Sequence, residues 1–420
     1  MSAIDTRRLF DKMPTSKKRK NVPPVSAMDH ISALPDHILH HMLSFLPAQL
    51  AVQTCVLARR WRNLWRSTTG LRIHGLDNEN SVKVKDLRKF VDHLLILLER
   101  THLDTVQIAF NEYDDDDLPD VNLWIRFAVM CKVRVLTLHI LQGFYLDLDD
   151  LRLVSRHLVT LDLLGVALQK TSLDFTSCSA LEDLKMNECK ITADRISSHS
   201  LKHLSISYCY SDSIRRVRIS APGLVSLKLQ DFIGITPFLE DMPLLQAAYV
   251  NLGSECMNFC LNYDYGVSYG ANNNTCENCV PINNDCSREC VILSGISNAK
   301  HLELISEFGM FIFRRDLNHC PTFSKLRTLL LNEYWCETRE LDRLACILKN
   351  SPVLEKLTLQ LFSKGPNHKV EIKGSYSSVE KSSAISKHLN IVEVKCDEID
   401  ERILNVLKFL YAFNIWFSFV

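Results

Sequence analysis

Short apolar clusters recur along most of this chain at a nearly regular interval. From about residue 130 onward they follow the pattern apolar-x-x-Leu-x-apolar, so that alternate positions are apolar. The central residues of these clusters are Leu136, Leu161, Leu184, Leu204, Leu227, Ala248, Leu302, Leu329 and Leu357, with a weaker last member at Val392. Alternation with a period of two predicts a short strand at each cluster, with one face buried.

The interval between the clusters indicates how these strands assemble. The first six central residues are 20 to 25 positions apart, which is the range of leucine-rich repeats. Each repeat covers its apolar face only against its neighbours, so the strands should stack into a solenoid. The expected fold class is α plus α/β, with a curved parallel sheet and with helices or irregular segments on the outside. Longer intervals late in the chain leave room for helices, such as one over 338–350.

A compact helical unit is predicted before the repeats, over residues 29–69. Pro35 suits the first position of a helix, and Pro47 should end that helix. Apolar residues recur at helical spacing in three short helices: Ile38, Leu39, Met42, Leu43 and Leu46; then Ala51, Val52, Cys55 and Val56; then Trp61, Leu64 and Trp65, before Gly70. Three short helices cannot bury this much apolar surface alone, so we expect a protein-binding face here.

Three segments lack this periodicity. Residues 1–28 contain several prolines and the basic run 17–20, which predicts a disordered tail; the run is either a nuclear address or a solvated stretch. Residues 251–297 are rich in Asn, Cys and Tyr and predict a long loop that interrupts the repeats. The acidic run 114–117 predicts a solvated loop.

Composition narrows the class of partner. The chain has 420 residues, with 49 Lys+Arg and 49 Asp+Glu, so it carries no global basic field for nucleic acid or for an anionic membrane. No apolar run approaches the roughly 20 residues needed to span a bilayer. The 15 cysteines follow an N-terminus without an apolar leader, so we expect free thiols in a reducing compartment, the nucleus and/or the cytoplasm.

Three patterns resemble catalytic or metal sites. Gly266 to Gly270 fit G-x-S-x-G around Ser268, but a nucleophile elbow needs a strand before the serine and a helix after it, and the flanks here are loop-like. No catalytic residue is therefore predicted. His37 and His41 lie one helical turn apart on a polar face, which predicts surface histidines. The zinc-like spacing belongs to Cys276, Cys279, Cys286 and Cys290, which are weak candidates; no metal or cofactor is otherwise expected.

Residues 29–69 closely resemble an F-box. The likeness is carried in order by Leu34-Pro35-Asp36, Ile38, Leu39, Leu43 to Pro47, Ala51-Val52, Thr54 to Leu57 and Arg59 to Trp65. The stretch 388–410, HLNIVEVKCDEIDERILNVLKFL, resembles part of the terminal FBD domain of plant F-box/leucine-rich-repeat proteins. The predicted organisation is an F-box over 29–75, repeats over 76–360 and an FBD-like segment over 361–420.

The resemblance implies a non-catalytic receptor of a ubiquitin ligase. The F-box would dock on a Skp adaptor, and through it on a cullin–RING assembly, while the repeats would hold an unknown protein target for ubiquitination. The adaptor-binding residues implied are Leu34, Pro35, Ile38, Leu39, Leu46 and Val52, with Trp61, Leu64 and Trp65 completing the small core or its rim. The alternative is a leucine-rich-repeat scaffold without a ligase partner. A hydrolase centred on Ser268 is disfavoured by its loop context.

The last ten residues, YAFNIWFSFV, leave two possibilities open. The alternation of Ile415, Phe417 and Phe419 favours a final strand that caps the last repeat, as an exposed solenoid end requires. Alternatively, the segment is an apolar tail that promotes aggregation.

Overall fold

The computed structural model describes most of the chain after the N-terminal tail. The described residues are 31, 33–74, 83–98, 103–111, 113–141, 145–147, 155–169, 173–213, 215–253, 255–256, 290–307, 311–336, 341–362, 370–376, 386–413 and 415–419. The predicted tail 1–28 lies outside them, as do Ser268, Cys276, Cys279 and Cys286.

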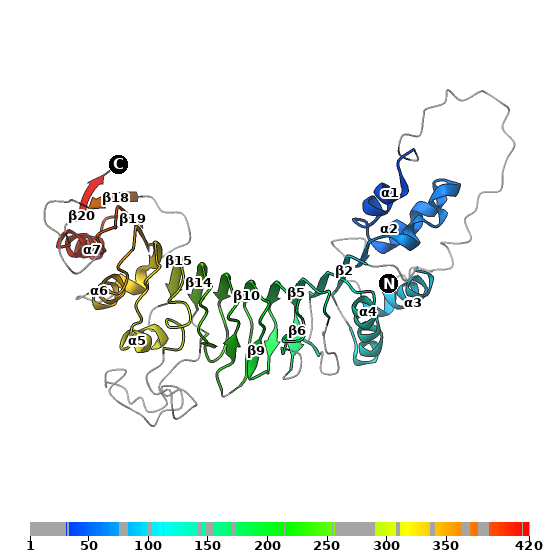
Figure 1. Ribbon diagram of the computed structural model, residues 1–420, viewed down its shortest axis with the longest axis horizontal. Coiled ribbons are helices and arrows are strands. Elements are labelled where there is room, and N and C mark those ends of the chain that lie inside the picture. Colours follow the sequence, from blue (N-terminus) through cyan, green and yellow to red (C-terminus); the bar gives the residue numbers. More distant parts are fainter. Residues whose placement is uncertain are drawn as a thin grey trace.

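Helices occur mainly at the two ends of the molecule (Figure 1). The α-helices are α1 (Asp36–Leu43), α2 (Ala48–Gln53), α3 (Val84–Leu97), α4 (Leu118–Met130), α5 (Phe311–Leu317), α6 (Asp342–Lys349) and α7 (Glu401–Tyr411). Short 3-10 turns are η2 (Thr54–Val56), η3 (Arg59–Arg62), η4 (Leu64–Ser67), η5 (Asp115–Asp117) and η6 (Glu333–Cys336). Helix α6 confirms the helix predicted over 338–350. Among the described residues, no helix combines the length and the apolar character needed to cross a membrane.

The strands form one long sheet and two small ones. Within the described residues the main sheet has 14 strands in the order β1-β2-β3-β5-β7-β10-β12-β14-β15-β16-β17-β19-β18-β20. Their bounds are β1 Gly70–Ile73, β2 Thr105–Phe110, β3 Val135–Ile140, β5 Thr160–Leu164, β7 Asp183–Asn187, β10 His203–Ser207, β12 Ser226–Gln230, β14 Ala247–Leu252, β15 His301–Ser306, β16 Thr328–Asn332, β17 Lys356–Leu361, β18 Val370–Tyr376, β19 Ile391–Cys396 and β20 Ile415–Phe419.

The small sheets, β4-β6-β8 and β13-β11-β9, contain β4 (Leu146–Asp147), β6 (Val166–Leu168), β8 (Lys190–Ile191), β9 (Arg195–Ser197), β11 (Arg218–Ser220) and β13 (Phe238–Leu239). Figure 1 shows the repeats as an arc, with α1 and α2 at one end and α7 at the other.

The strand register confirms the repeat pattern. All ten central residues, from Leu136 to Val392, lie directly opposite one another on successive strands. The same row continues backwards through Val106 and Leu71, in two strands that the repeat pattern did not predict. Every strand in this row is parallel to the next, and the central residues are 3 % exposed or less. This row is the spine of the core, because each central side chain packs on those of the neighbouring repeats.

A sharp turn ends several successive strands in the middle of the solenoid. Gly165, Glu188, Tyr208 and Asp231 occupy equivalent positions, and all four have a positive φ, between 47° and 70°. At Gly165 a Cβ atom would lie 2.4 Å from the Ile140 carbonyl oxygen, so that glycine also permits a close backbone approach.

Buried thiols follow two of these turns. Cys189 donates from its Sγ to the Asn187 carbonyl at 3.3 Å, and Cys209 donates to the Met186 carbonyl at 3.5 Å. Burial raises the pKa of the Cys209 thiol, so it stays a protonated donor. These cysteines satisfy backbone carbonyls inside the solenoid.

The acidic run 114–117 is only partly the solvated loop that its charge predicts, because Asp114, Asp115 and Asp116 are exposed but Asp117 is buried. Asp117 is 3 % exposed and its carboxylate accepts from the Asp114 N–H at 3.0 Å, which starts turn η5 ahead of α4. Arg88 of α3 donates to Asp117 at 2.6 Å and contacts Asp120 at 2.5 Å. The acidic residues therefore hold α3 against α4, which sequence alone could not show because Arg88 is distant in the chain.

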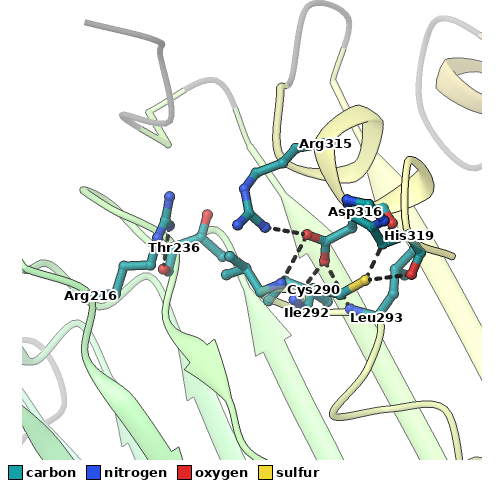
Figure 2. Close-up of polar contacts among 9 residues, drawn as sticks. Arg216, Thr236, Cys290, Ile292, Leu293, Arg315, Asp316 and His319 are labelled. Carbon is teal, nitrogen blue, oxygen red and sulfur yellow. Dashed lines mark hydrogen bonds and ion pairs between the residues drawn. The ribbon is translucent and has the colours of Figure 1, made fainter. Parts of the chain in front are cut away.

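A buried carboxylate organises the chain where it re-enters the repeats after the long interruption (Figure 2). Asp316, in α5, accepts hydrogen bonds from the N–H groups of Val291, Ile292 and Leu293 at 2.9, 2.7 and 3.0 Å. Arg315 donates to the same carboxylate at 3.0 Å. The side chain of Asp316 has no exposed surface, so these bonds replace the water that a charged group would otherwise need. The described part of the predicted 251–297 loop thus includes a core segment at 290–297.

The C-terminal residues form the strand that their alternation favours. Strand β20 pairs antiparallel with β18, and β18 pairs antiparallel with β19, so the parallel sheet ends in two antiparallel strands. Ile415 is fully buried. The segment therefore covers the last edge of the repeats, and helix α7 packs beside it.

Deleting residues 414–420 should lower the stability of the repeat domain by about 2–4 kcal/mol, because the backbone bonds of β20 and the burial of Ile415 are lost. Urea unfolding followed by circular dichroism measures this change. Ile415→Ala should reproduce part of the loss while keeping the strand. An unchanged midpoint together with improved solubility would instead identify the segment as an apolar tail.

Candidate functional site

The N-terminal unit, defined here as residues 33–69, contains a small cluster of buried apolar side chains. Its buried side chains are Leu39, Leu43, Ala48, Ala51, Trp61, Leu64 and Trp65. The third helix predicted over Trp61 to Trp65 is instead two consecutive 3-10 turns, η3 and η4, separated by Asn63. The tighter turns still direct both tryptophans inward, and the indole N–H of Trp65 donates to the Arg62 carbonyl at 3.1 Å.

Large apolar side chains also stand out from this unit. Between residues 38 and 57 the exposed apolar set comprises Ile38, Met42, Phe45, Leu50, Val56 and Leu57. Val56 is 82 % exposed and Leu57 is 67 % exposed. These side chains lie outside the buried cluster of the unit. A group of exposed apolar residues on a small unit is characteristic of a protein-binding surface.

The structure divides the predicted adaptor-binding residues into three groups. Pro35 and Ile38 are exposed. Leu34, Leu46 and Val52 are half-buried against the core. Leu39, Trp61, Leu64 and Trp65 are buried and support the surface from beneath. Phe45, Val56 and Leu57 were not among the predicted site residues. Val56 belongs to the apolar stripe of the second predicted helix, and Phe45 and Leu57 are apolar residues outside the predicted stripes.

One ion pair closes the N-terminal unit. Arg60 donates from Nε to the Asp36 carboxylate at 3.0 Å and from Nη2 to the Leu34 carbonyl at 2.6 Å. The hydrogen bond from Arg60 lowers the pKa of Asp36, so the carboxylate stays charged at neutral pH. The ion pair therefore stabilises the folded chain fully at a pH above the ordinary pKa of an aspartate. This stabilisation is lost as the pH falls through the lower pKa that Asp36 has in the folded chain. The pair fixes the start of α1 against η3.

The N-terminal unit is joined directly to the first strand of the solenoid. Arg72 in β1 donates to the Ser44 carbonyl at 3.1 Å, and Gln49 donates to the His74 carbonyl at 3.3 Å. Arg66 donates to the Leu97 carbonyl at the end of α3, at 2.8 Å. The apolar core of the unit is continuous with that of the repeats. A partner bound on the unit therefore has a defined position relative to the sheet.

The solvent-facing side of the main sheet carries rows of polar side chains. The predicted solvent-facing residues Asp162, Lys185, Ser205 and Lys228 lie in consecutive register on four strands. The row continues through Tyr249 and Glu303. None of these six side chains belongs to the buried core, so they are available to a ligand that lies across the strands.

Two tyrosines, Tyr208 and Tyr249, lie near the middle of the solvent-facing side of the main sheet. Tyr208 is 47 % exposed, and its hydroxyl accepts from the Gln230 amide at 2.7 Å. The ammonium of Lys228 lies 5.9 Å from the centre of the Tyr249 ring. Burial raises the pKa of Tyr249, so its hydroxyl remains a neutral donor and acceptor. Tyrosine beside charged and amide groups is a frequent composition of protein-binding hot spots.

No family model matches the chain, but curated plant proteins do. The rice meiotic F-box protein MOF (Oryza sativa subsp. japonica) is 28 % identical over 366 residues, 79 % of this chain and 71 % of that protein. An F-box/FBD/LRR-repeat protein of Arabidopsis thaliana is 26 % identical over 396 residues, 85 % of this chain and 82 % of its own length. An FBD-associated F-box protein of Arabidopsis is 30 % identical over 262 residues, covering 54 % and 62 % of the two chains.

The chain is a relative of the plant F-box/FBD/LRR-repeat proteins. The large parallel sheet fits the repeats in that name. The N-terminal unit stands at the place of the F-box motif, and β18 to β20 with α7 stand at the place of the FBD-like segment.

The candidate metal ligands are only partly described. Cys290 is buried, and its Sγ donates to the carbonyls of Asp316 at 3.3 Å and His319 at 3.0 Å (Figure 2). Burial raises the pKa of Cys290 to about 12, so its thiol stays protonated and donates these two hydrogen bonds. Its three predicted partners lie outside the described residues. His37 and His41 are exposed on α1. In the described part of the chain, no three His, Cys, Asp or Glu side chains are grouped as metal ligands.

Proposed function

We propose that this chain is the substrate-recognition subunit of a Skp–cullin–F-box ubiquitin ligase. The observation that carries the proposal is the exposed apolar set on the N-terminal unit, which lies outside the buried cluster of that unit, in a relative of plant F-box proteins. Docking on a Skp adaptor would bury these side chains, and the burial of apolar surface would contribute favourable free energy to binding.

The sheet would hold the protein target. Its solvent-facing rows combine tyrosines, lysines and amides over many repeats, a composition that suits a protein surface better than a small apolar ligand. Because the N-terminal unit is bonded to β1 and α3, the adaptor and the target would be kept at a set separation. Ubiquitin transfer itself would belong to the partner subunits, and we infer no catalytic role for this chain.

A repeat scaffold without ligase partnership is the second candidate. It has the same sheet, but its N-terminal unit would have no obligate partner. Proximity labelling with the intact chain and with a variant lacking residues 29–69 separates the two functions. Targets that accumulate when these residues are removed support the ligase receptor, whereas an unchanged target population supports the scaffold.

Leu34→Ala together with Ile38→Ala should weaken binding of the intact chain to a Skp adaptor at least tenfold. Both side chains lie at the start of α1, and truncation removes contact area worth about 1–4 kcal/mol. Isothermal titration measures the affinity, and circular dichroism checks that the double variant remains folded. Undiminished affinity in a folded double variant would contradict docking through this part of the unit.

A further inference from the structure

Cationic side chains gather around a concavity on the edge of the sheet where the strands begin. Its volume is about 380 Å³, and its lining includes Lys300, Ser324, Lys325, Arg327, Glu355 and His388. Each of these residues immediately precedes β15, β16, β17 or β19 or belongs to the loops before them. In Figure 1 these strands lie at the opposite end of the arc from α1 and α2, so the concavity is separate from the N-terminal unit.

Strand register sets two of the cations side by side. The N–H of Arg327 donates to the Lys300 carbonyl at 2.8 Å, and the N–H of Glu355 donates to the Arg327 carbonyl at 2.8 Å. Lys300, Arg327 and Glu355 therefore hold equivalent positions on neighbouring strands, which are about 4.8 Å apart. Lys300 and Arg327 therefore place two positive charges beside each other, and an anion near both would offset their repulsion.

The described residues supply only part of the negative charge that would offset Lys300 and Arg327. Glu355 is the one carboxylate among the described lining residues, and it lies 3.3 Å from Arg327. Lys325 donates to neutral oxygens, the Asn298 amide at 3.0 Å and the Pro243 carbonyl at 3.4 Å. Lys300 makes no ion pair with any described residue.

A lysine elsewhere on the same edge of the sheet does have a carboxylate beside it. Lys202 holds the equivalent place before β10, and its ammonium contacts the Glu182 carboxylate at 2.6 Å. Each of these two positions carries an exposed lysine, but only that of Lys202 has a described carboxylate beside it. Lys300 thus differs from Lys202 in having no described carboxylate beside it.

We propose that this concavity binds a phosphate monoester, either as a free molecule or on a phosphorylated side chain of a protein. The Arg327 guanidinium can donate two parallel bonds to phosphate oxygens, and the lysines add point charges. The Ser324 hydroxyl and the His388 ring are further polar groups of the lining. A concave surface lined mainly by one sign of charge concentrates its field, which favours a dianion over a carboxylate. The volume accommodates a phosphate with its attached residue.

Titration of the intact chain with inorganic phosphate at low ionic strength tests the proposal. We expect saturable binding with a dissociation constant on the order of 1 mM, weakened at least tenfold by Lys300→Ala with Arg327→Ala. Lys202→Ala is the matched control and should leave the affinity unchanged. Absence of saturation by 20-fold excess over that value (about 20 mM phosphate), or equal loss in the Lys202 variant, would overturn the site.

Further titrations distinguish the two sources of the phosphate. O-phosphoserine represents the free monoester, and a phosphoserine peptide represents the protein-borne one. Tighter binding of the peptide than of O-phosphoserine, abolished in the double variant, assigns the site to a protein ligand, and equal affinities assign it to a free monoester. The proposal is contradicted if the unphosphorylated peptide binds equally to the intact chain and to the double variant while neither binds phosphate. Arg327→Lys keeps the charge and should restore part of the affinity, which separates binding from a folding defect.

Discussion

Val56→Glu together with Leu57→Glu should reduce the affinity of the chain for a Skp adaptor by at least 100-fold, about 2.8 kcal/mol. Both side chains are largely exposed, so the substitutions add no charge to the folded core. In the proposed complex, however, two carboxylates would enter an apolar contact, where unpaired charges are strongly unfavourable. Isothermal titration with the purified adaptor gives the change in affinity, and urea unfolding shows whether the chain alone is unaffected.

Ile96→Glu provides a matched control for this experiment. Ile96 is 80 % exposed, as Val56 is, but it lies near the end of α3 outside the N-terminal unit. We expect little change in adaptor affinity from this substitution. Equal losses in both variants would mean that added negative charge, and not the exposed apolar set, weakens binding. Full affinity in the Val56 and Leu57 variant would exclude these residues from the adaptor interface.

Asp316→Ala should destabilise the repeat domain by about 3–5 kcal/mol, because it removes a fully buried acceptor that serves three backbone N–H groups and Arg315. The N–H groups of 291–293 would remain buried without their acceptor, so that segment should open locally. Urea unfolding measures the overall loss. Amide hydrogen exchange is the more direct measurement, since long repeat proteins do not always unfold in one step.

Two further substitutions serve as comparisons for Asp316→Ala. Asp316→Asn retains one acceptor oxygen and should cause a smaller loss than alanine. Asp174→Ala removes an exposed carboxylate that also accepts a backbone N–H, from Thr176 at 3.1 Å, and should cost about 1 kcal/mol or less. Unchanged exchange protection of 291–293 in the Asp316→Ala variant would show that the carboxylate does not hold this segment in place.

The structure bears on the predicted adaptor-binding residues through the burial of their side chains. The resemblance to an F-box placed Leu39 among the adaptor-binding residues, whereas its side chain is fully buried. Val56 and Leu57 were left out of the predicted site although they are the most exposed apolar residues there. The third helix became two 3-10 turns, which rotate the following side chains differently from an α-helix.

The amino-acid sequence by itself determined the repeat architecture. Alternation with a period of two, repeated every 20 to 25 residues, admits one register, because a slip by one residue would turn every apolar side chain outward. Even the weak members Ala248 and Val392 took their expected places in the row. The sequence also indicated the separate helical unit, since its prolines and apolar spacing are local signals.

Only the tertiary structure decided which polar groups were buried and which charges met. Asp117 is paired with Arg88, and Asp316 with the backbone of 291–293, although nothing in the local sequence marks either carboxylate as buried. Lys300 and Arg327 are 27 positions apart in the chain, yet strand register makes them neighbours. Such contacts depend on long-range pairing, and a local pattern carries no information on them.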